Sequence, residues 1–169
     1  MRLIGLSGSL RAGSFNSALL REAQGLTLAG VELGAGSIRD IPLYDGDLEH
    51  EQGLPPAVVK LKDLIADSDG LMLFTPEYNN SIPGVFKNAV DWLSRPADDI
   101  GRVFGGLPVA VLGASPGGFG TILSQNAWWP VLRTLGTDPW FEGRLMVARA
   151  GSVFDAEGRV TDEAIRKRL

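Results

Sequence analysis

Short apolar runs alternate with segments of helical spacing along the whole chain. Three of the runs are almost continuously apolar, which is typical of buried strands: RLIGLS at 2–7, GLMLFT at 70–75 and LPVAVLGA at 107–114. A weaker run, VELGAGSI at 31–38, and a later one, RLMVARA at 144–150, predict two more strands. The pattern therefore predicts five strands.

The segments between these runs carry apolar residues three and four positions apart, which predicts helices. The predicted helices lie at 16–29, 57–69, 84–95 and 121–136, and a closing helix follows near the C-terminus. Thr161 is expected to cap the closing helix, with Asp162 and Glu163 in its first turn. The segment at 41–56 is expected to be a long polar loop with turn residues.

Strands that alternate with helices predict a parallel sheet covered by helices on both faces. Because crossovers between parallel strands are right-handed, few topologies fit. The expected fold is a flavodoxin-like three-layer α/β sandwich with a five-stranded parallel sheet in the order 2-1-3-4-5. A chain of 169 residues suits a single domain, residues 1–169. Ligands of such sheets bind beyond the carboxyl ends of the strands, so the loops after the first, third and fourth strands form the candidate site.

Charge and composition narrow the classes of partner. Sixteen basic residues against twenty acidic ones give a formal charge of -4, without a basic run, so neither nucleic acid nor a membrane is an expected partner. No long apolar segment or secretory start occurs, so a cytoplasmic location is expected. The chain has no cysteine, so any redox chemistry needs a bound cofactor. The single histidine, His50, lies in a polar stretch and is expected to be solvated.

The loop after the first predicted strand combines the groups that bind a phosphate. Residues 8–17, GSLRAGSFNS, hold glycines, hydroxyls, an amide and Arg11, and they lead into a helix. A helix N-terminus presents unpaired N–H groups and partial positive charge, which suit a monoester phosphate. The dinucleotide pattern GxGxxG and the P-loop pattern are both absent. The alternative is an ordinary turn in which Ser14 or Asn16 is a simple helix N-cap.

The loops after the third and fourth strands could hold a planar ring. Residues 75–84, TPEYNNSIPG, contain two prolines that stiffen the backbone, so its N–H and C=O groups can face a heterocycle such as an isoalloxazine. Residues 113–120, GASPGGFG, are rich in glycine and permit close backbone approach. Each loop alone could be a simple connection, but three such loops at strand carboxyl ends indicate one ligand site.

Several stretches resemble the NAD(P)H-dependent FMN reductase family, which includes quinone, azo-dye and chromate reductases. They are GSLRAGSFN at 8–16, TPEYNNSIPGVFKNAVDWLSR at 75–95, GASPGGFG at 113–120 and IPLYDGDLE at 41–49. The resemblance implies an oxidoreductase that transfers hydride from NAD(P)H to bound FMN and on to a small-molecule acceptor. That acceptor would be a quinone, an azo compound, a flavin or a metal oxyanion. The resemblance also implies a homodimer or homotetramer.

The same resemblance implies which residues bind FMN. In the first loop the phosphate would be held by Ser9, Arg11, Ser14, Phe15, Asn16 and Ser17. The isoalloxazine would be lined by Pro76, Glu77, Tyr78 and Asn79, and bordered by Ser115, Gly117 and Gly118. No side chain is needed as a general acid or base, so no catalytic residue is assigned.

Other functions remain open from the sequence. A flavodoxin-type electron carrier usually has a phosphate loop rich in Thr and Gly and a strongly acidic surface, and Arg11 argues against it. A flavin-free regulatory module on the same fold would purify colourless and take up no FMN. A metal hydrolase finds few ligands in a chain with one histidine and no cysteine. The adjacent Trp128 and Trp129 could belong to the core or to a subunit contact.

Overall fold

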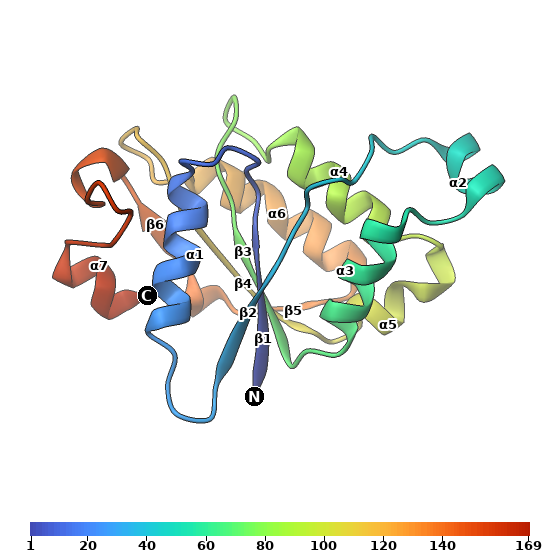
Figure 1. The fold of residues 1–169 in the computed structure, drawn as a ribbon, viewed down its shortest axis with the longest axis horizontal. Coiled ribbons are helices and arrows are strands. Elements are labelled where there is room, and N and C mark those ends of the chain that lie inside the picture. The colour runs from blue at the N-terminus through green and yellow to red at the C-terminus, as the bar shows by residue number, and fades with distance from the viewer.

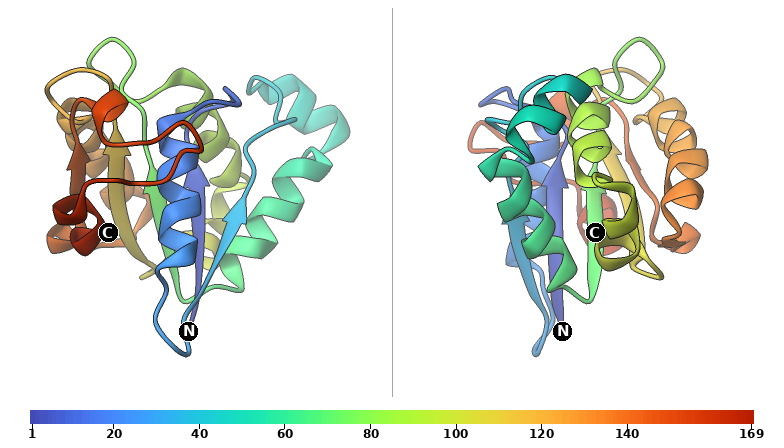
Figure 2. Two further views of the ribbon diagram at one scale, coloured as in Figure 1. Left: turned by 60° about the vertical axis from the view of Figure 1, so that its left-hand side comes forward. Right: turned by 90° about the vertical axis from the view of Figure 1, so that its right-hand side faces the viewer.

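The computed structural model describes residues 1–169 and shows one parallel sheet between two layers of helices (Figures 1 and 2). The strands are β1 (Arg2–Ser7), β2 (Glu32–Gly36), β3 (Gly70–Phe74), β4 (Pro108–Ala114), β5 (Asp138–Pro139) and β6 (Leu145–Val147). Their order is β2-β1-β3-β4-β5, with β6 also paired to β4, and every pairing is parallel. The predicted flavodoxin-like fold and order are confirmed, with β6 as the predicted fifth strand.

Two short strands share the last position in the sheet. β5 pairs with the beginning of β4, where Pro108 lies opposite Asp138, and β6 pairs with its end, where Leu112 lies opposite Leu145. The sequence does not predict β5, because two residues, one of them a proline, show no apolar period.

Helices cover both faces of the sheet. One face carries α1 (Phe15–Gly25) and α7 (Glu163–Arg168), and the other carries α3 (Pro56–Ala66), α4 (Gly84–Leu93), α5 (Ile100–Phe104) and α6 (Ile122–Leu135). Successive strand residues alternate between the two cores, since Leu73 packs with α4 and α6 while Phe74 packs with α1. Burial on both faces explains why the strands are continuous apolar runs. None of these helices has the length and apolar character needed to span a membrane.

The segment expected to be a polar loop contains the helix α2 (Gly46–Gln52), so that prediction was wrong. Asp45 caps this helix, because its Oδ1 accepts hydrogen bonds from the N–H groups of Asp47 at 2.9 Å and Leu48 at 3.4 Å. A capping Asp followed by acidic residues is a helix-start signal. α2 has no buried residue, so the apolar period that predicts the other helices is absent from it. His50 lies exposed on α2, as expected.

The closing helix begins later than predicted, and its cap is Asp162 rather than Thr161. The Asp162 Oδ1 accepts hydrogen bonds from the N–H groups of Ala164 at 2.9 Å and Ile165 at 3.0 Å. The Thr161 hydroxyl instead donates to the carbonyl oxygen of Val153. Both residue types can cap a helix, so the tertiary contact of Thr161 decides which one does.

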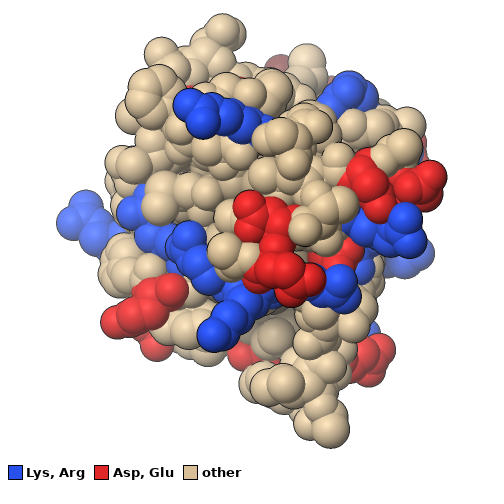
Figure 3. Space-filling view, turned by 90° about the vertical axis from the view of Figure 1, so that its left-hand side faces the viewer, with Lys and Arg blue, Asp and Glu red and all other residues tan.

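Opposite charges lie close together on the face that carries α7 (Figure 3). Arg159 Nε is 2.8 Å from Asp155 Oδ2, and Arg166 Nη2 is 3.5 Å from Glu22 Oε1. Because the arginines are exposed, each such pair contributes only about 0–1 kcal/mol.

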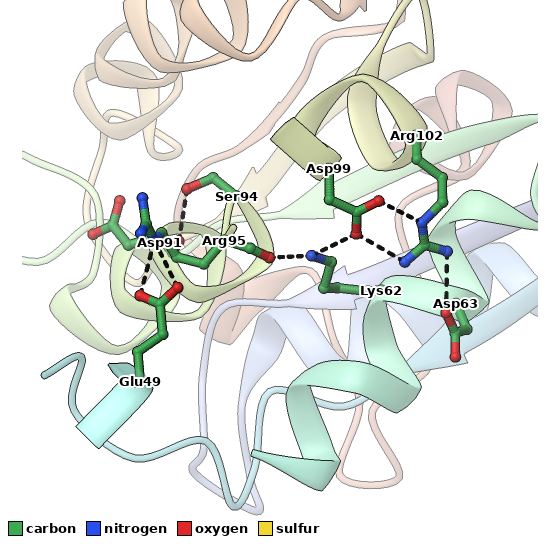
Figure 4. A network of polar contacts seen from close by, with 8 residues as sticks. All are labelled: Glu49, Lys62, Asp63, Asp91, Ser94, Arg95, Asp99 and Arg102. Atoms are coloured by element: carbon green, nitrogen blue, oxygen red, sulfur yellow. Dashed lines mark hydrogen bonds and ion pairs between the residues drawn. The ribbon is translucent and has the colours of Figure 1, made fainter. Parts of the chain in front are cut away.

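A network of ion pairs joins α3 to the segment between α4 and α5 (Figure 4). Lys62 is only 1% exposed, and its ammonium group donates to the carbonyl oxygen of Arg95 and lies 2.8 Å from Asp99 Oδ2. The same carboxylate accepts from Arg102 Nε at 2.8 Å. Arg95 Nε lies 2.9 Å from Glu49 Oε2, which ties α2 to the end of α4. A buried ammonium group requires such partners, so the network holds these segments in place.

Replacing Asp99 by Asn is expected to lower stability at neutral pH but not in acid. Arg102 and Lys62, which donate hydrogen bonds to the Asp99 carboxyl, hold its pKa well below its usual range. Because the unfolded-state pKa is about 3.9, the ionised carboxylate stabilises the fold above about pH 4, and this stabilisation is lost as the pH falls toward the folded-state pKa. The difference in unfolding free energy between wild type and Asp99→Asn, measured by urea denaturation, should therefore narrow below about pH 4. A constant difference would contradict this role.

Candidate functional site

Three loops meet beyond the carboxyl ends of β1, β3 and β4, at the upper edge of the sheet in Figure 1. They are the β1–α1 loop (residues 8–14), the β3–α4 loop (residues 75–83) and the β4–α6 loop (residues 115–121). The fold therefore brings together the three loops that the sequence predicts as a site.

The bases of these loops are bonded to one another. The N–H of Gly8 donates to the carbonyl oxygen of Phe74 at 2.9 Å, which joins the starts of the first two loops. The buried side chain of Asn16 reaches the end of β4, where its Nδ2 donates to the Ala114 carbonyl oxygen and its Oδ1 accepts from the Ala114 N–H, both at 2.9 Å. The side chain of Asn16 thus holds α1 against β4, and it is not directed at a ligand.

The β1–α1 loop and the first residue of α1 offer free backbone donors. Five N–H groups here have no hydrogen-bond partner within the protein, those of Ser9, Leu10, Ala12, Gly13 and Phe15. The next two N–H groups are satisfied by the cap of α1, because Ser14 Oγ accepts from Asn16 at 3.2 Å and from Ser17 at 3.4 Å. Free N–H groups at a helix N-terminus are the donor set that an anion requires.

A guanidinium group and hydroxyl groups accompany these donors. Arg11 is exposed and forms no ion pair, and its guanidinium carbon lies 5.9 Å from the centre of the Phe15 ring. Ser17 Oγ is 2.8 Å from Ser7 Oγ, and both residues line a polar hollow of about 230 Å³ together with Ser9. The β1–α1 region therefore carries a positive charge, hydroxyls and backbone donors, the kinds of group that bind a monophosphate. Arg11 does not line the hollow.

The tip of the β3–α4 loop is a tight turn. The N–H groups of Tyr78 and Ser81 each donate to the carbonyl oxygen of the other at 3.1 Å. The two residues between them, Asn79 and Asn80, have φ values of +50° and +63°, a left-handed conformation that asparagine tolerates better than most residues. Tyr78 is 47% exposed and Asn79 is exposed as well, so both residues are accessible to a planar ligand.

The other two predicted residues of this loop have side chains that are buried or hydrogen-bonded within the protein. Pro76 is buried. The Glu77 carboxylate accepts hydrogen bonds from the N–H groups of Leu123 at 2.9 Å and Ser124 at 3.1 Å, at the start of α6. The sequence offers no signal for this contact, because Glu77 and α6 are distant along the chain and meet only in the fold.

The β4–α6 loop exposes backbone N–H groups to solvent. Gly117 and Gly118 are exposed, and their N–H groups have no partner within the protein. The Gly117 carbonyl oxygen accepts from the Arg149 N–H at 2.8 Å, and Ser115 is half-buried beside it. Two glycines with free N–H groups allow a ring to approach the main chain closely.

A second, mostly apolar hollow of about 450 Å³ lies at the opposite edge of the sheet. Leu3, Leu28, Leu71 and Trp140 are among the residues that line it. It borders the beginnings of β1 and β3, so it is separate from the three-loop site.

Comparison with known proteins assigns the chain to a family. The sequence profile of the NADPH-dependent FMN reductases matches residues 1–151. The protein belongs to this family. It is 43% identical over 167 residues to an NAD(P)H-dependent FMN reductase of Pseudomonas aeruginosa, an alignment that covers 99% of this chain and 88% of that one. It is also 37% identical over 162 residues to a 2-hydroxy-1,4-benzoquinone reductase of Burkholderia sp, with 96% and 86% covered.

A solved structure agrees with this assignment. FerB, a flavoenzyme NAD(P)H:(acceptor) oxidoreductase from Paracoccus denitrificans, superimposes with a TM-score of 0.86 at 36% identity, covering 98% of this chain and 89% of FerB. The predicted family, enzyme class, FMN cofactor and NAD(P)H donor are confirmed. The residues present also fit FMN, because the β1–α1 loop carries donors for a monophosphate and the other two loops present an accessible aromatic ring and free N–H groups.

Proposed function

We propose that this FMN reductase passes electrons from NAD(P)H to quinones at the three-loop edge of a single domain, residues 1–169. The observation that carries the proposal is the set of five free N–H groups beside the unpaired Arg11, in a loop whose base is bonded to the base of the β3–α4 loop. FMN, when bound, accepts hydride from NAD(P)H and supplies electrons to the acceptor.

The residues of the site have different roles in this proposal. In the β1–α1 region, Ser9, Arg11, Phe15 and Ser17 would hold the phosphate through hydroxyls, the guanidinium group and backbone N–H groups. Tyr78, Asn79, Ser115, Gly117 and Gly118 would surround the ring. Ser14, Asn16, Pro76 and Glu77 have side chains that cap helices, bridge loops or lie buried, so they would shape the site rather than contact FMN with those atoms.

Quinones are the proposed acceptor class for two reasons. The relatives include a protein named 2-hydroxy-1,4-benzoquinone reductase. The loops of the site also carry exposed aromatic residues, since Phe119 is 72% exposed and Tyr78 lies exposed in the β3–α4 loop. Aromatic side chains favour stacking with planar acceptors. Azo compounds, free flavins and metal oxyanions are further acceptors that the same electron source could serve.

We further infer that the protein works in the cytoplasm, where NAD(P)H is supplied, as a homodimer or homotetramer. The family resemblance supports self-association, and the exposed apolar side chains of Leu10, Leu43 and Phe119 are candidates for subunit contacts.

Absorption spectroscopy of the purified protein, with FMN added if needed, tests the proposed function. Flavin bands are expected to bleach when NADPH is added without oxygen and to return when benzoquinone follows. A protein that stays colourless and takes up no FMN would support a flavin-free module instead. Bands that NADPH leaves unchanged would support an electron carrier, and bands that bleach but do not return with benzoquinone would exclude quinones as acceptors.

A further inference from the structure

The first turn of α6 has no local cap. Thr121, which precedes the helix, has a φ of +67°, and its side chain makes no capping hydrogen bond. The N–H groups of Leu123 and Ser124 are bonded instead by the carboxylate of Glu77, from the β3–α4 loop. A single Oε2 atom accepts both bonds, at 2.9 and 3.1 Å. One side chain from the β3–α4 loop therefore provides the hydrogen-bond acceptor for two N–H groups in the first turn of α6.

A second set of hydrogen bonds joins the β3–α4 loop to α6 at the base of the loop. The buried hydroxyls of Thr75 and Ser124 lie 2.9 Å apart, and Trp128 Nε1 donates to Thr75 Oγ1 at 3.1 Å. These groups anchor the base of the β3–α4 loop to α6. Glu77 follows Thr75 by two residues and lies further from the sheet. The hydrogen bonds that its carboxylate accepts therefore hold the outer part of the loop against α6.

We propose that Glu77 is a positioning residue for FMN: its carboxylate oxygen sets the spacing between the β3–α4 and β4–α6 loops, the two loops that surround the ring. The role depends on the reach of the side chain and on its acceptor oxygen. A negative charge acting on the flavin directly is not required, because the carboxylate faces two N–H groups of the protein.

Two conservative variants separate reach from charge. Glu77→Gln keeps the length and an acceptor oxygen but removes the charge, whereas Glu77→Asp keeps the charge but is one methylene too short to reach both N–H groups. Glu77→Asp is expected to weaken FMN binding about tenfold, since the free loops must be ordered on binding, and Glu77→Gln is expected to stay within about threefold of wild type. The dissociation constant is measured by equilibrium dialysis of the full chain against FMN.

Hydrogen–deuterium exchange of the FMN-bound protein supplies a second readout. Exchange at Leu123 and Ser124 should become faster in Glu77→Asp and stay close to wild type in Glu77→Gln. Glu22→Ala is a matched control, because Glu22 Oε2 also accepts a remote N–H, that of Val160 at 3.2 Å, but on α1 beside the C-terminal segment. It should reduce stability without changing FMN affinity.

Three outcomes would overturn the proposal. Unchanged FMN affinity in Glu77→Asp, despite faster exchange in α6, would leave Glu77 with a purely structural role. Weak binding in Glu77→Gln with retained binding in Glu77→Asp would show that the charge acts on the flavin itself. Equal losses in Glu77→Asp and Glu22→Ala would show an effect of general stability. This inference rests on the proposed site: wild-type protein that binds no FMN would refute the proposed function and the role of Glu77 together, whereas FMN binding by wild type with unchanged affinity in Glu77→Asp would refute only the role of Glu77.

Discussion

Replacing Arg11 by Ala is expected to weaken FMN binding by about 1.5–3 kcal/mol, or roughly 10- to 150-fold. The guanidinium group is exposed and forms no ion pair within the protein, so it is free to bind the phosphate of FMN. The free N–H groups around it would still bind the phosphate, but without the positive charge and the bidentate hydrogen bonds of the guanidinium group. The dissociation constant can be measured by the quenching of FMN fluorescence.

Two controls test whether the phosphate is the group that Arg11 binds. Arg133→Ala removes the same charge from an exposed position in the last turn of α6 and should leave FMN affinity unchanged. Riboflavin lacks the phosphate, so its affinity should be the same in wild type and Arg11→Ala. An equal loss for riboflavin and FMN would place Arg11 near the ring, and unchanged FMN binding would remove it from the site.

Replacing Trp128 by Ala is expected to lower the free energy of unfolding by about 3–5 kcal/mol. Its side chain is fully buried, and its ring packs edge-on against Phe86 with 5.0 Å between the ring centres. Truncation leaves a large cavity in the core under α6. It also removes the donor to the Thr75 hydroxyl at the base of the β3–α4 loop. Urea denaturation of wild type and variant measures the loss.

The adjacent tryptophan provides the control. Trp129 is half-buried and packs against Phe141, with its ring 5.2 Å from the guanidinium carbon of Arg144. Trp129→Ala should therefore cost only about 1 kcal/mol. Similar losses for both variants would contradict the assignment of Trp128 to the core. The sequence left open whether Trp128 and Trp129 belong to the core. The structure shows that only Trp128 is fully buried in the core between the sheet and the helices.

The fold was predictable because its determinants are local. Continuous apolar runs mark strands buried on both faces, helical spacing marks the connections, and right-handed crossovers leave few arrangements. The same reasoning fails for β5, which has two residues, and for α2, which buries none and so lacks an apolar period.

The sequence by itself determined where the proposed flavin site lies and which groups its loops offer. The position of a loop at a strand carboxyl end follows from topology, and its donors follow from composition, as the β1–α1 loop with Arg11 shows. Only the tertiary structure decided which side chains are free to meet a ligand. Asn16 is bonded to Ala114 and Glu77 to α6, although both lie in the predicted motifs. The physical reason is that a polar side chain takes whichever partner packing brings within about 3 Å, and that partner can be far away in the chain.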